Sequence, residues 1–136
     1  MNACVVYFSR TGNTKRFAQA IAETAKAPLF DISTTQPSAI VNFELLILGT
    51  PVEGSRPTKE TSAFIENLPK AEGKKTVLFC TNRIFGSSRT MNIMQQMLET
   101  KGYETVLKIS KKGMKPGKES DFSEILAEVK KTLEKQ

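Results

Sequence analysis

The strongest structural signal in this chain is the stretch Val5-Val6-Tyr7-Phe8-Ser9-Arg10-Thr11-Gly12-Asn13-Thr14. Its first half is a continuous apolar run, rich in β-branched residues, that predicts a strand buried on both faces. Its second half gathers hydroxyl side chains around a glycine and leads into a helical pattern. Such a turn can wrap a phosphate, because free backbone N–H groups and hydroxyls meet at an electropositive helix N-terminus.

Apolar runs and helical periods alternate along the rest of the chain. Strands are expected at 3–8, 28–32, 45–49, 75–81 and 103–109. Helices are expected at 14–26, from Pro57 in its first turn to Leu68, around 91–98, and from a cap at Ser120 or Asp121 to Leu133, with a short helix inside 33–43. Strands joined through helices run parallel. We therefore predict that residues 1–136 form a single domain, a three-layer, doubly wound α/β fold with a five-stranded parallel sheet.

Three loops of this fold are the richest in Gly, Ser and Thr. They follow the first, third and fourth predicted strands, at 9–13, 50–56 and 82–87. Ligands of doubly wound sheets bind beyond the carboxyl ends of the strands. We therefore expect a single site built from these three loops.

The composition excludes several kinds of chemistry. The chain has no histidine, which rules out imidazole metal sites and a histidine base. Its two cysteines, Cys4 and Cys80, lie in predicted strands and are expected to be small buried hydrophobes, as in a reducing compartment. No signal peptide is recognised, and no segment approaches the ~18 apolar residues of a membrane span. A soluble, cytoplasmic protein without a membrane partner is expected.

The net charge of +6 is concentrated in one stretch without acids, which holds Lys108, Lys111, Lys112, Lys115 and Lys118. One interpretation is a solvated loop and helix entry. The other is a docking patch for an acidic partner. No aromatic residues interleave with these lysines to stack bases, so no nucleic-acid partner is expected.

With these elements in place, the chain resembles the flavodoxins over nearly its whole length. Residues 5–14 match the family's first strand and phosphate loop, [TS]-x-T-G-x-T, and residues 46–52 (Leu-Ile-Leu-Gly-Thr-Pro-Val) are similar to its third strand and the loop that covers the flavin. The last strand carries no long insertion. The resemblance therefore implies a short-chain member with strand order 2-1-3-4-5.

The resemblance implies FMN as the cofactor and divides the candidate residues into three groups. The phosphate loop would consist of Ser9, Arg10, Thr11, Gly12, Asn13 and Thr14, with the Arg10 side chain pointing to solvent. One face of the isoalloxazine would lie along Pro51, Val52, Glu53 and Gly54. The other side and the pyrimidine edge would lie along Thr81, Asn82, Arg83, Phe85 and Gly86.

The chain departs from the family pattern in two respects. Flavodoxins usually stack a tryptophan or tyrosine on the flavin, whereas the sole aromatic candidate here is Phe85, which either stacks or packs under its loop. Electron-carrying flavodoxins are typically acidic, whereas this chain is basic. Arg10, Arg56 and Arg83 lie in the three loops, and nearby cations stabilise a reduced flavin. We therefore expect a less negative reduction potential than that of an acidic flavodoxin.

Two functions remain open from the sequence. The first is a one- or two-electron carrier that uses redox partner proteins, needs no catalytic side chain and is a monomer or weak dimer. The second is an NAD(P)H-dependent flavin or quinone reductase of the same fold, with Arg56 and Arg83 binding a nucleotide phosphate. The clustered aspartates of a receiver domain, the Cys-x5-Arg loop of a small phosphatase and the Gly-Lys-Ser/Thr of a P-loop are absent.

Overall fold

The computed structural model describes residues 2–115 and 120–136. In chain order the elements are β1 (Ala3–Tyr7), α1 (Asn13–Ala25), β2 (Leu29–Asp31), β3 (Leu45–Pro51), α2 (Lys59–Glu66), β4 (Lys74–Asn82), α3 (Ser87–Glu99), β5 (Tyr103–Lys112) and α4 (Ser123–Lys135). Two short 3₁₀ segments, Ile32–Thr34 and Pro37–Ile40, lie between β2 and β3.

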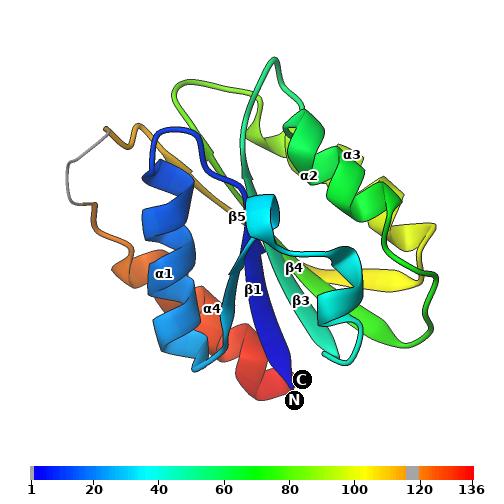
Figure 1. Ribbon diagram of the computed structural model, residues 1–136. Coiled ribbons are helices and arrows are strands. Elements are labelled where there is room, and N and C mark those ends of the chain that lie inside the picture. The colour runs from blue at the N-terminus through cyan, green and yellow to red at the C-terminus, as the bar shows by residue number, and fades with distance from the viewer. Residues whose placement is uncertain (1, 116–119) are drawn as a thin grey trace.

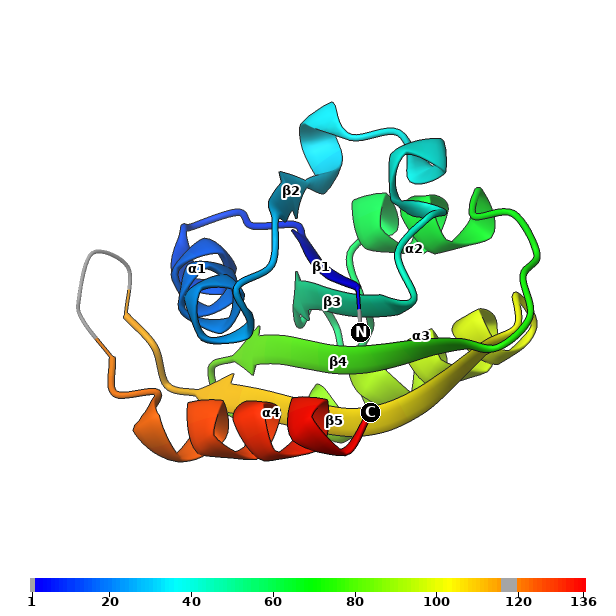
Figure 2. The same cartoon turned by 90° about the horizontal axis from the view of Figure 1, so that it is seen from below.

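All strand pairs are parallel, and the strand order is β2-β1-β3-β4-β5. Helices α1 and α4 cover one face of the sheet, and α2 and α3 cover the other (Figures 1 and 2). The predicted three-layer, doubly wound fold and its strand order are confirmed. No helix of the described part of the chain is long and apolar enough to cross a membrane.

The central strands are apolar on both faces because each face meets a helical layer. In β3, Leu45 and Ile47 belong to the core that includes Phe17 of α1 and Val129 of α4. Alternate residues of the same strand point to the opposite core, against α2 and α3. This arrangement explains why the strand sequences are continuous apolar runs rather than alternating patterns.

Two predicted helix starts are wrong by a few residues. Pro57 does not lie in the first turn of α2, because Thr58 is the N-cap and its hydroxyl accepts from the Thr61 N–H at 3.1 Å. Helix α4 begins at Ser123 rather than directly after Ser120 or Asp121. The Asp121 carboxylate nevertheless accepts from the Ser123 N–H at 2.9 Å.

Three strands extend further than the sequence predicts. β3 continues to Pro51 rather than ending at Gly49, and the extensions of the other two strands matter for the site. β4 continues to Asn82, and β5 continues to Lys112 rather than ending at Ile109, with Asn82 and Lys112 as register partners. The Gly113 N–H then donates to the Asn82 carbonyl at 2.9 Å. The chain that follows β5 is thereby carried to the carboxyl edge of the sheet.

Candidate functional site

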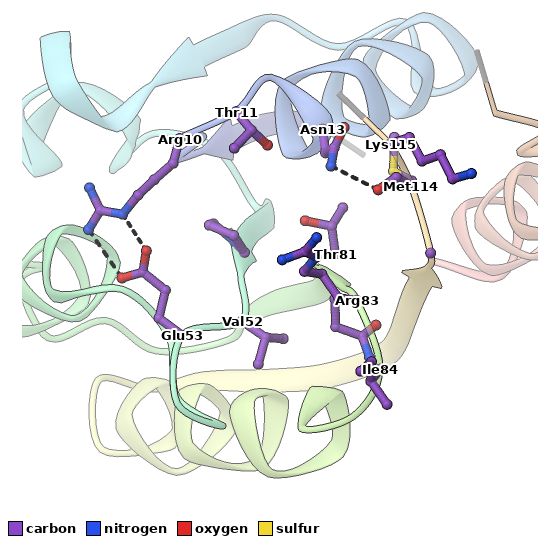
Figure 3. A pocket seen from close by; sticks show the side chains of 13 residues that line it. Arg10, Thr11, Asn13, Val52, Glu53, Thr81, Arg83, Ile84, Met114 and Lys115 are labelled. Carbon is purple, nitrogen blue, oxygen red and sulfur yellow. Dashed lines mark hydrogen bonds and ion pairs between the residues drawn. The ribbon is translucent and has the colours of Figure 1, made fainter. Parts of the chain in front are cut away.

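A pocket of about 830 Å³ opens at the carboxyl edge of the sheet, where the loops after β1, β3, β4 and β5 converge (Figure 3). Nine of the predicted site residues line it, from the three expected loops and the end of the strand before the third loop: Arg10, Thr11, Asn13, Pro51, Val52, Glu53, Thr81, Asn82 and Arg83. Parallel strands end at one edge, so tertiary folding brings together segments more than 60 residues apart in the chain.

Six further predicted site residues do not line the pocket. Ser9 and Gly12 lie within the first loop, Thr14 lies buried beneath it, and Gly54 lies in the turn after β3. Gly86 lies where the loop after β4 contacts the loop after β3. The Phe85 side chain is 74% exposed, so in this structure it neither packs under its loop nor forms a wall of the pocket.

The loop before α1 is shaped by one hydroxyl group. Ser9 Oγ accepts from the backbone N–H of Gly12 at 3.0 Å and of Lys15 at 3.2 Å. Gly12 has φ 94°, a left-handed conformation that glycine adopts without strain. Within the described residues, the N–H groups of Thr11, Asn13 and Thr14 donate to no protein acceptor. These free donors at a helix N-terminus suit an anion such as a phosphate.

The Arg10 side chain turns away from these donors toward the loop after β3 (Figure 3). Its guanidinium forms ion pairs with Glu53 and, at 2.9 Å, with Glu60 in the first turn of α2. The same group lies 4.9 Å from the centroid of the Phe8 ring. The hydrogen bonds that Arg10 donates, first to Glu53 and then to Glu60, raise the pKa of Arg10. Arg10 therefore links three segments, and its charge is offset by two carboxylates.

A tight turn follows β3 at the pocket. The N–H and carbonyl groups of Glu53 and Arg56 exchange hydrogen bonds of 2.9 and 3.1 Å. Gly54 and Ser55 between them have φ of 59° and 61°, the pattern of a type I′ turn. This turn packs closely against Gly86 in the loop after β4. The approach is so close that a Cβ atom added to Gly86 would lie 2.9 Å from Ser55 Oγ.

Four pocket residues were not predicted from the sequence to belong to the cofactor site. Ile84 lies inside an expected loop but is apolar, and Gly113, Met114 and Lys115 follow a strand that was expected to end earlier. Hydrogen bonds hold this last segment: Asn13 Nδ2 donates to the Met114 carbonyl at 3.2 Å, and Arg16 donates to the Lys115 carbonyl at 2.9 Å. The sequence signal that could have indicated this segment is Gly113, a glycine directly after the last strand.

One residue of the pocket wall carries a buried acceptor without a partner. Asn82 Oδ1 is buried and accepts no hydrogen bond from any described residue. A buried unpaired acceptor costs free energy unless a ligand or water donates to it. Metal binding has no comparable support, since no group of three or more His, Cys, Asp or Glu side chains gathers anywhere in residues 2–115 and 120–136.

The basic stretch does not form one patch. Lys108 donates to Asn92 and Gln95 of α3, on one face of the sheet. Lys111 donates to the Asp121 carbonyl beside α4, on the other face, as the alternation of a strand requires. Lys115 lines the pocket, and Lys118 lies outside the described residues.

Sequence and structure comparisons agree on the class of protein that this fold and pocket define. The flavodoxin domain family matches residues 4–106. The flavodoxin of Megasphaera elsdenii is 30% identical over 106 residues, which are 72% of this chain and 77% of that protein. The crystal structure of oxidised Flavodoxin 2 from Bacillus cereus superposes with a TM-score of 0.82 at 21% identity and covers 100% of both chains.

The chain therefore belongs to the flavodoxin family. Flavodoxins are FMN-binding flavoproteins of electron transport, which pass electrons to redox partner proteins. The residues present fit this cofactor in two respects. The free N–H groups at the start of α1 suit its phosphate, and the unpaired Asn82 acceptor suits a polar ring with an N–H donor.

Proposed function

We propose that this protein is an electron carrier that holds FMN in the pocket between the loops after β1, β3, β4 and β5. The observation that carries the proposal is the set of free N–H donors on Thr11 and Asn13, which line that pocket, and on Thr14, which lies buried beneath their loop. They would bind the phosphate through backbone dipoles, without a cationic side chain. Bound FMN takes up and releases one or two electrons, and the protein supplies its binding and its electrostatic surroundings.

The flavin ring would lie between the loop after β3 and the loop after β4. Pro51 and Val52 would offer apolar contact on one side, and Ile84 would do so on the other. Asn82 Oδ1 would accept a hydrogen bond from the ring, which would satisfy the buried acceptor. Neither side offers an aromatic wall, so ring contacts would contribute less to affinity than phosphate contacts do.

The protein itself would control the charge around the cofactor. The pocket-lining residues include three cations, Arg10, Arg83 and Lys115, and one carboxylate, Glu53. The Arg10 charge is offset by ion pairs, so Arg83 and Lys115 remain as the cations that would stabilise a reduced flavin. The partner would be an acidic redox protein, and the carrier would act as a monomer or weak dimer.

A titration of the protein with FMN and with riboflavin, followed by flavin absorbance and fluorescence, tests this proposal. FMN is expected to bind more tightly, because riboflavin lacks the phosphate. Ser9→Ala removes the acceptor that shapes the loop, so it should weaken FMN binding far more than riboflavin binding. Ser38→Ala, remote from the pocket, is the control. Absence of any spectral change with FMN would refute the proposal.

An NAD(P)H-dependent flavin or quinone reductase is the competing function. The observation in its favour is Arg83, an exposed cation at the pocket that could bind a nucleotide phosphate. Steady-state oxidation of NADH and NADPH by the FMN-loaded protein decides between the two. A carrier shows negligible turnover without a partner, whereas a reductase shows saturable turnover that Arg83→Gln diminishes.

A further inference from the structure

The loop after β4 carries an unusual apolar tip. Ile84 and Phe85 are 69% and 74% exposed, and no other large hydrophobic side chains are exposed in the part of the chain that the structure describes. Ile84 borders the pocket, whereas Phe85 stands beside it. Large apolar groups held in water at the mouth of a ligand pocket point to a partner that covers them.

The tip is held in place by its neighbours. Gly86 has φ 101°, and its position against Ser55 and Val52 leaves no space for a Cβ atom. The Thr90 N–H and hydroxyl both donate to the Gly86 carbonyl, at 3.0 and 2.8 Å. The residue that follows the tip is therefore fixed by the loop after β3 on one side and by α3 on the other, which restricts the backbone of the tip and lowers the entropy cost of docking.

The surroundings of the tip are basic. From Gly73 to Leu98 the chain has no acidic residue, while Arg83 precedes the tip and Arg89 follows it in the first turn of α3. Lys115 stands on the far wall of the pocket, and Arg56 lies next to Ser55 in the contacting turn. The nearby carboxylates of Glu53 and Glu60 are occupied by Arg10.

From these observations we infer that Ile84 and Phe85 form the apolar centre of a docking surface for an acidic redox protein, with Arg83, Arg89, Arg56 and Lys115 as its cationic rim. An apolar centre within a charged rim is the usual anatomy of a protein interface, and the rim would steer an acidic partner to the pocket mouth. Phe85 thus contacts the partner rather than the flavin. This inference rests on the proposed electron-carrier function.

A matched pair of probe proteins tests the charge preference: cytochrome c, which is basic, and succinylated cytochrome c, whose lysines have become carboxylates around the same haem. Two ferric haems take the two electrons of one fully reduced FMN, and its protons pass to water. At low ionic strength the succinylated probe should be reduced roughly tenfold faster than the native probe. Added salt should slow reduction of the succinylated probe, by screening its attraction, and accelerate reduction of native cytochrome c, by screening its repulsion.

Two variants test the surface itself. Phe85→Ser should slow reduction of the succinylated probe by roughly tenfold, as expected for loss of an interface anchor, with FMN affinity unchanged. Arg89→Glu should slow reduction of the succinylated probe and weaken the dependence of that rate on salt. Lys131→Glu, an equal charge change on α4, is the control and should alter neither.

A third measurement does not depend on the cofactor. Amide NMR spectra of the full chain, titrated with succinylated cytochrome c, should show the largest changes at 83–86 and 89. If FMN fails to bind, the electron-carrier proposal fails, while this titration still tests the surface. Faster reduction of native cytochrome c, changes mapped elsewhere, or altered FMN affinity in Phe85→Ser would overturn the inference.

Discussion

Thr14 Oγ1 lies 2.8 Å from Thr81 Oγ1. Both residues are buried: Thr81 lines the pocket, and Thr14 lies beneath it. This hydroxyl pair joins the first turn of α1 to the carboxyl end of β4, across 67 residues of chain. The pair thereby holds the loop after β1 and the loop after β4 in fixed positions relative to each other.

Breaking this pair should cost stability. Thr14→Val leaves the Thr81 hydroxyl buried without its partner, and we expect the free energy of unfolding to fall by about 1–3 kcal/mol. The double variant Thr14→Val/Thr81→Val should lose less than the sum of the single variants, because no unpaired hydroxyl remains. Urea unfolding followed by circular dichroism measures all four states of this cycle. Strict additivity would show that the two hydroxyls do not interact.

The contact between the loops after β3 and β4 depends on a glycine. Gly86→Ala adds strain at φ 101° and places a Cβ atom 3.0 Å from Val52 Cγ1 and 2.9 Å from Ser55 Oγ. Gly73 has φ 68° with open space around it, so Gly73→Ala carries the backbone strain alone. Gly86→Ala should therefore destabilise the protein by roughly 1–3 kcal/mol more than Gly73→Ala does. Equal urea midpoints for the two variants would contradict this view of the contact.

Charge at the pocket should set the reduction potential of bound FMN. Arg83→Gln removes a cation from the pocket wall, so we expect the potential to become more negative. The shift should be on the order of 1 kcal/mol, or about 40 mV per electron, and should shrink with added salt. Spectroelectrochemical titration measures it, with Lys131→Gln on α4 as the remote control. An unchanged potential would show that Arg83 is fully screened.

The two cysteines should make stability fall at high pH. Burial raises the pKa of both Cys4 and Cys80 from 9.0 to about 12. Below pH 9 the thiols are protonated in both states, and between pH 9 and 12 they ionise only when the chain is unfolded. The free energy of unfolding should therefore fall with pH in this window, by up to about 1.4 kcal/mol per pH unit for each thiol.

A pH series of urea unfolding curves checks this prediction. The variant Cys4→Ala/Cys80→Ala titrates the same lysines and tyrosines but no thiols, so the difference between the two profiles isolates the cysteines. A constant difference between pH 8 and pH 11 would contradict the prediction. Native thiols should also remain unreactive toward a disulfide reagent at pH 8, because the attacking form is the thiolate.

Much of the fold and part of the pocket were predictable from local sequence. The apolar run from Val5 to Phe8 predicts a strand buried on both faces, and the turn from Ser9 to Thr14 predicts free donors at a helix start. Alternation of strands and helices predicts the layers. These features depend on period, turn chemistry and covalent order, which are properties of neighbouring residues.

The completion of the pocket depends on long-range contacts. The sheet register extends β5 to Lys112 and so brings Gly113, Met114 and Lys115 to the pocket wall. An ion pair with Glu53 turns Arg10 away from the free N–H groups before α1, and the loop whose Gly86 contacts Ser55 leaves Phe85 exposed to water. Each outcome depends on contacts between residues distant in the chain, which composition and periodicity do not encode. Local sequence therefore accounts for the layers and for the loop before α1, whereas packing between distant loops sets which side chains face the pocket.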